Sequence, residues 1–85
     1  MNIFENISEL LQGGKARDIK EKVAEALASG AKPSEILEKG LIAGMNIIGV
    51  KFRNNDIFVP EVLIAARAMN SALEVLKPAL INSGV

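Results

Sequence analysis

The sequence contains no cysteine, no histidine, no tryptophan and no tyrosine, and only three of its 85 residues are phenylalanine. Without cysteine the chain can form neither a disulfide nor a thiolate metal site. Without histidine it lacks the most common metal ligand and the most common general base at neutral pH. The five serines therefore have no imidazole to activate them. These absences argue against an enzyme, and we expect a non-catalytic protein.

An excess of charge of one sign is also missing. Ten basic and ten acidic residues give a formal net charge of zero, and neither sign forms a run. A protein that follows a phosphate backbone needs a basic patch, so nucleic acid is not an expected partner.

Long apolar runs are missing as well. Charged residues interrupt every stretch that could approach the roughly 18 consecutive apolar residues of a membrane span. Glu5 and Glu9 stand where a signal peptide would have a basic start and an apolar stretch. We therefore expect no membrane segment and a cytoplasmic location.

Apolar residues instead recur every three or four positions along the chain, which is the spacing of amphipathic helices. A first helix is predicted from Ile3 to Leu11, ended by Gly13-Gly14, because glycine readily takes positive φ. A second is predicted over about residues 15–29, with Gly30 as its stop.

Prolines mark two further predicted helices. One begins at Pro33 and continues to about Arg53, and the next begins at Pro60, since proline suits the first helical turn. Pro78 should kink or end this last helix. The tail at positions 81–85 has no evident anchor and is expected to fray.

Glycines within the third predicted helix require an explanation, because each lowers helix propensity by about 1 kcal/mol relative to alanine. Gly40 and Gly44 lie one turn apart on the same face, which indicates the close approach of a neighbouring helix. The expected buried face of this helix comprises Leu37, Leu41, Gly44 or Met45, Ile48 and Phe52.

Four helices with short connections and no strand signal predict an all-α fold. The expected architecture is a small four-helix up-and-down bundle, in which residues 1–85 form a single domain. Phe52, Val59 and Val62 would then lie near the turn between the third and fourth helices, at one end of the bundle. On periodicity alone, we favour the interpretation that these three residues fill the end of the core over the interpretation that they form a binding surface.

Two stretches carry a resemblance to a known family. "GMNIIGVKF" and "FVPEVLIAARAM", joined by a short turn, closely resemble the helical cap module of corrinoid proteins. Those proteins are the methyl carriers of anaerobic methyltransferase systems, and the segment is also similar to the cap of cobalamin-dependent methionine synthase. The resemblance extends over nearly the whole chain, although the first two helices match mainly as generic amphipathic segments.

The resemblance implies a cofactor and a role for four residues. In that family the cap is a four-helix bundle over the upper, methyl-bearing face of cobalamin. Phe52 and Val59 fall where the family places the apolar side chains that cover the cobalt-bound methyl group, with Val62 beside them. Val59 replaces a bulkier leucine of methionine synthase. Glu38 aligns with a glutamate that hydrogen-bonds the edge of the corrin, although a solvated carboxylate explains it equally well.

The chain departs from the family in one respect. The lower cobalt ligand of the family comes from an Asp-x-His-x-x-Gly motif in a following Rossmann-like domain, and this sequence contains no histidine. Val85 falls about where a linker to that domain would begin. We therefore expect the cap alone, a fragment with weak or unmeasurable cobalamin binding in isolation. The implied partners are the downstream Rossmann-like domain and corrinoid-dependent methyltransferases.

Two hypotheses remain open from the sequence. The first is a corrinoid-protein cap that takes part in methyl transfer. The second is a small helical protein-interaction domain without a cofactor, which docks a partner or forms a homodimer through its apolar end. Both predict an uncovered apolar patch at the turn between the third and fourth helices.

Overall fold

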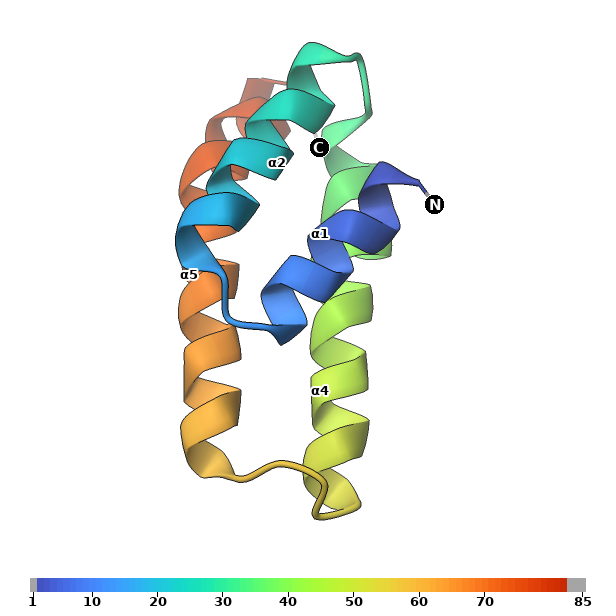
Figure 1. The fold of residues 1–85 in the computed structure, drawn as a ribbon. Helices are drawn as coiled ribbons and strands as arrows, with labels where there is room; N and C mark the ends of the chain where they lie inside the picture. The colour runs from blue at the N-terminus through green and yellow to red at the C-terminus, as the bar shows by residue number, and fades with distance from the viewer. Residues whose placement is uncertain (1, 83–85) are drawn as a thin grey trace.

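The computed structural model describes residues 2–82, which form helices and turns and no strand (Figure 1). The helices are α1 (Ile3–Gln12), α2 (Ala16–Ala28), α3 (Pro33–Glu35), η1 (Ile36–Ile42), α4 (Ala43–Arg53) and α5 (Val59–Asn82). The segments α3, η1 and α4 follow one another without a break and form the predicted third helix, of which η1 is a π-helical portion. The all-α helical bundle is confirmed. None of the helices described is long and apolar enough to cross a membrane.

Three helices end in the same hydrogen-bonded turn. At the end of α1, Gly14 has φ of 68°, and the Lys15 N–H donates to the Leu10 carbonyl at 2.9 Å. Gly30 at the end of α2 and Asn55 after α4 take the corresponding positive φ angles, 95° and 64°. This is the Schellman arrangement, which satisfies the last carbonyls of a helix. The predicted stops at Gly13-Gly14 and Gly30 are confirmed.

The four helical rods pack as two pairs. Figure 1 shows α2 lying along α5, and α1 lying against η1 and α4. Side chains from all these elements meet in one core between the pairs. Its fully buried members are Ile7, Leu11, Ile19, Val23, Ala26, Ile36, Leu41, Ala68, Ala72 and Leu76. Three of these core residues are alanines: Ala26 on α2, and Ala68 and Ala72 on α5. Their small side chains let the two helices pack closely.

The close approach predicted at two glycines is confirmed. A Cβ atom added to Gly40 would lie 2.9 Å from Ile7 Cγ2, and one added to Gly44 would lie 2.7 Å from Leu11 Cδ2. Carbon atoms normally pack at about 3.5–4.0 Å, so α1 can lie this near only because both positions lack a side chain. Gly49 differs, because a Cβ atom there would meet nothing within 4 Å.

The end of the third rod extends beyond its neighbour. Gln12 and Gly13 at the end of α1 lie level with Ile48 on α4, and Figure 1 shows α4 and α5 continuing past that point to their own connecting loop. Phe52 is therefore 46% exposed, so its predicted place on the buried face is wrong. α1, which covers the earlier part of this rod, ends at Gln12 and does not reach Phe52.

The other helix ends differ slightly from expectation. α5 begins at Val59, one residue before the predicted start, and it continues through Pro78 to Asn82. Pro78 was predicted to kink or end the helix, and of these two alternatives the end is wrong. Ile81 and Asn82, which were expected to fray, are helical, and the remaining expectation, for positions 83–85, lies outside the described residues.

Candidate functional site

The turn between α4 and α5 is closed by backbone hydrogen bonds. The Asp56 N–H donates to the Lys51 carbonyl at 2.8 Å, and the Val62 N–H donates to the Phe58 carbonyl at 3.2 Å. The first bond ends α4 and the second starts α5. This short connection holds the end of α4 beside the beginning of α5 (Figure 1).

Three of the predicted site residues lie at this end of the molecule, and we call them the apolar tip: Phe52, Val59 and Val62. Phe52 is 46% exposed and Val59 is 55% exposed, whereas Val62 is half-buried. They are therefore not sealed inside the fold. The interpretation of Phe52 and Val59 as a core plug, which periodicity favoured, does not agree with this exposure.

Further apolar side chains are exposed near the tip. Phe58 is 64% exposed and Leu63 is 62% exposed. Ile47, Val50 and Ile64 are also exposed. Several large exposed apolar side chains near one end of a fold indicate a contact with another molecule. Helical periodicity missed these residues because it searches for one apolar face, whereas they lie on several sides of α4 and α5.

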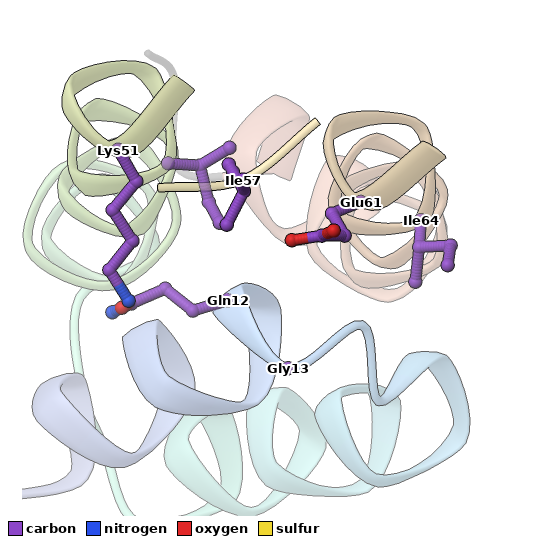
Figure 2. A pocket seen from close by; sticks show the side chains of 7 residues that line it. Gln12, Gly13, Lys51, Ile57, Glu61 and Ile64 are labelled. Carbon is purple, nitrogen blue, oxygen red and sulfur yellow. The ribbon is translucent and has the colours of Figure 1, made fainter. Parts of the chain in front are cut away.

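A small hollow of about 150 Å³ lies on the side of α4 and α5 that faces α1 (Figure 2). It is lined by Gln12, Gly13, Ile48, Lys51, Ile57, Glu61 and Ile64. None of the four predicted site residues lines it. The apolar tip is thus an exposed surface of the helix ends and is separate from this hollow.

Glu38, the fourth predicted residue, is not beside the tip. It lies in the π-helical segment η1 and is exposed to solvent. Fourteen residues separate it from Phe52, which corresponds to about 20 Å along a helix. Its neighbour Lys39 pairs with Glu35 at 3.5 Å, but the Glu38 carboxylate has no hydrogen-bond or ion-pair partner among residues 2–82.

Phe52 shares one side of α4 with residues earlier in that helix. Positions three or four residues apart on an α-helix lie above one another. We call the set with this spacing in α4, together with Ile42 directly before it, the outer stripe: Ile42, Met45, Gly49 and Phe52. Met45 is half-buried and the other three are exposed, so the stripe borders the core on one side and solvent on the other.

The fold and this surface agree with a known family. Residues 3–77 match the family described as B12 binding domain, and the chain belongs to that family. The resemblance to corrinoid-protein caps is confirmed, and cobalamin is the cofactor of the family.

Several similar proteins come from Methanosarcina species. The chain is 52% identical over 58 residues to trimethylamine corrinoid protein 1 of Methanosarcina mazei, which is 68% of this chain and 27% of that protein. It is 40% identical over 83 residues to monomethylamine corrinoid protein 2 of Methanosarcina acetivorans, 98% of this chain and 38% of that protein. The structure of the Methanosarcina barkeri monomethylamine corrinoid protein superposes with a TM-score of 0.87 at 37% identity. That match covers 89% of this chain and 36% of the other chain, so the chain spans about a third of the length of such relatives.

The exposed residues fit one face of cobalamin. The corrin is a flat macrocycle whose face is largely apolar, and the apolar tip offers an aromatic ring and a valine side chain to solvent. Among residues 2–82, no group of three or more His, Cys, Asp or Glu side chains could hold a metal ion. The exposed apolar side chains of the tip are suited to contact with a flat apolar face.

Proposed function

We propose that the chain is the cap of a corrinoid methyl carrier and covers the upper face of cobalamin with its apolar tip. The observation that carries this proposal is the solvent exposure of Phe52 and Val59 at the α4–α5 end of a B12 binding domain. Cobalamin, when bound, supplies the cobalt that holds the methyl group between donor and acceptor. The side chains of the tip exclude water from that group and take no part in bond making.

The exposed area of Phe52 sets the strength of this contact. A phenylalanine buries about 200 Å² when fully covered, and 46% of the Phe52 side chain remains open. About 90 Å² is thus available, which at about 25 cal/mol per Å² corresponds to about 2 kcal/mol. This contact is strong enough to hold a cap closed and weak enough to let it move aside for a methyltransferase.

The partners follow from this role. A Rossmann-like domain, following this chain in the sequence, would hold the lower face of the cofactor. Methyltransferases would dock when the cap opens and would decide which methyl donor is used. The relatives are named for trimethylamine and monomethylamine, which favours methylamines as the donor class.

A chimera tests the proposal. Residues 3–77 of this chain would replace the matching helical region of the M. barkeri monomethylamine corrinoid protein, which would then be loaded with methylcobalamin under anaerobic conditions. We expect Phe52→Ala to increase the rate of methyl loss in light several-fold. Losing about 2 kcal/mol of contact raises the uncovered fraction by at most about 30-fold. The visible absorbance of the cofactor reports the loss.

The matched control is Ile81→Ala, because Ile81 is 66% exposed at the other end of α5. It should leave the methyl lifetime unchanged. Circular dichroism should show the same helix content in both variants. A Phe52→Ala variant with reduced stability and an unchanged methyl lifetime would mean that Phe52 is structural and that the proposal is wrong. Dimerisation of the unmodified chain in sedimentation experiments, lost in Phe52→Ala, together with an unchanged methyl lifetime, would instead support the interaction domain.

A further inference from the structure

No close contact explains Gly49. Glycine is among the least favourable residues in a helix interior, yet Gly49 lies near the middle of α4, which runs from Ala43 to Arg53. Gly40 and Gly44 are explained by their contacts with α1. A Cβ atom on Gly49 would meet nothing within 4 Å outside its own helix backbone among residues 2–82, so packing in this part of the chain does not require a glycine there.

The position of Gly49 gives it a different neighbour. It belongs to the outer stripe, between Met45 one turn before it and Phe52 one turn after it. Both neighbours have long side chains, and Phe52 belongs to the apolar tip. Gly49 is therefore a low point on the α4 surface, directly beside the residues that are exposed for contact.

Helix dimensions show what this low point permits. The backbone of a helix has a radius of about 2.3 Å, whereas the helix with its side chains measures about 10–12 Å across. A flat molecule lying against a position without a side chain can therefore come about 3 Å closer to the axis. Glycine serves the same purpose where a backbone closely approaches a ligand.

We infer that Gly49 is a positioning residue at which the corrin ring approaches the α4 backbone. This inference rests on the proposed function and adds a second contact region to the tip. The ring would lie across the outer stripe, over Gly49, with Phe52 reaching the group on the cobalt. The exposed Glu38 carboxylate lies further along the third rod, in η1.

The inference predicts that a side chain at position 49 is tolerated or favourable for folding but unfavourable for cobalamin binding. Gly49→Ala should raise the melting temperature of the 85-residue chain by about 4 °C, because it improves helix propensity in open space. Gly49→Leu, which raises a larger obstacle at the same point, should weaken cobalamin binding by the chimera about tenfold. A tenfold change corresponds to about 1.4 kcal/mol.

The experiment compares Gly49→Ala, Gly49→Leu and a control, Ala24→Leu, in the chimera and in the 85-residue chain. Ala24 is an exposed residue on α2, so the control adds the same side chain on another helix. Cobalamin affinity is measured by absorbance titration, and folding is measured by thermal melting. We expect the control to bind as the unmodified chimera does, Gly49→Ala to melt higher, and Gly49→Leu to bind more weakly.

Two results would overturn the inference. One is unchanged cobalamin affinity in Gly49→Leu, and the other is a lower melting temperature in Gly49→Ala, which would give the glycine a structural role. The Phe52→Ala variant separates this failure from failure of the proposed function. If Phe52→Ala shortens the methyl lifetime while Gly49→Leu binds normally, only the inference about Gly49 is wrong. If neither variant affects the cofactor, the cap proposal itself fails.

Discussion

Replacing Gly44 by alanine tests the helix contact on which the whole bundle depends. The added Cβ atom would lie 2.7 Å from Leu11 Cδ2, 3.1 Å from the Ser8 carbonyl oxygen and 3.2 Å from Ser8 Oγ. Leu11 is fully buried, so its side chain has little space in which to turn away. The Ser8 carbonyl belongs to the backbone of α1. We therefore expect α1 to shift away from α4.

The magnitude follows from two opposing terms. Overpacking a well-filled core costs about 1–3 kcal/mol, while the better helix propensity of alanine returns about 1 kcal/mol. A net loss of up to about 2 kcal/mol in the free energy of unfolding is therefore expected for Gly44→Ala. For a domain of this size, a loss of about 2 kcal/mol lowers the melting temperature by about 8–16 °C.

Urea unfolding followed by circular dichroism measures this loss, with Gly49→Ala as the matched control. Both variants make the same chemical change in the third helical rod, but only Gly44 faces another helix. The two should differ in the free energy of unfolding by the cost of overpacking alone, about 1–3 kcal/mol. Equal stabilities for the two variants, or a Gly44→Ala variant more stable than the unmodified chain, would refute the close contact between α1 and α4.

Two further predictions concern α5 and the turn before it. Leu76→Ala should lower the free energy of unfolding by about 2–5 kcal/mol, because Leu76 is fully buried, whereas Ile81→Ala should change it by less than about 0.5 kcal/mol, because Ile81 is exposed. Urea titration of both variants measures the difference, and similar values would contradict the core assignment. Asn55→Val should lower the free energy of unfolding by about 1–2 kcal/mol, and Asn55→Gly should leave it unchanged or raise it, because φ at this position is 64°. A valine variant that melts at or above the temperature of the glycine variant would count against this turn geometry.

The sequence was sufficient to predict four helical rods and most of their ends. Gly13-Gly14 and Gly30 signal helix ends because they can take positive φ, and Pro33 and Pro60 signal helix starts because their rings suit the first turn. These are local properties of the chain, and local properties can be read from neighbouring residues. Pro78 gave a local signal as well, but α5 continues past it to Asn82.

What could not be predicted depends on the length of a neighbouring helix. Periodicity assigned Phe52 to the buried face, and Phe52 does follow Ile48 and Met45 at helical spacing. Burial also needs a partner helix at the same height, and α1 ends at Gln12. The exposure of the apolar tip is a consequence of this difference in length, which the spacing of residues on α4 does not contain.

The different contacts of the three glycines and the π-helical form of η1 could not be predicted from the sequence either. Gly40, Gly44 and Gly49 have the same sequence signal, yet two face α1 and one faces open space. Whether a glycine of this rod contacts α1 depends on where α1 crosses the rod. Nothing in the residues of η1 distinguishes a π-helical turn from an α-helical one, so the segment that contains Glu38 was expected to be a regular helix.

The length of α5 places the apolar tip far from the other end of the helix. Its 24 residues extend about 35 Å from Val59 at the tip to Asn82 at the opposite end (Figure 1). If the chain pivots at the Asn82 end, a rotation of about 10° carries the tip through about 6 Å over that length. A small rotation at that end would thus be enough to uncover or cover the ring that we propose to lie beneath Phe52, without any change inside the bundle.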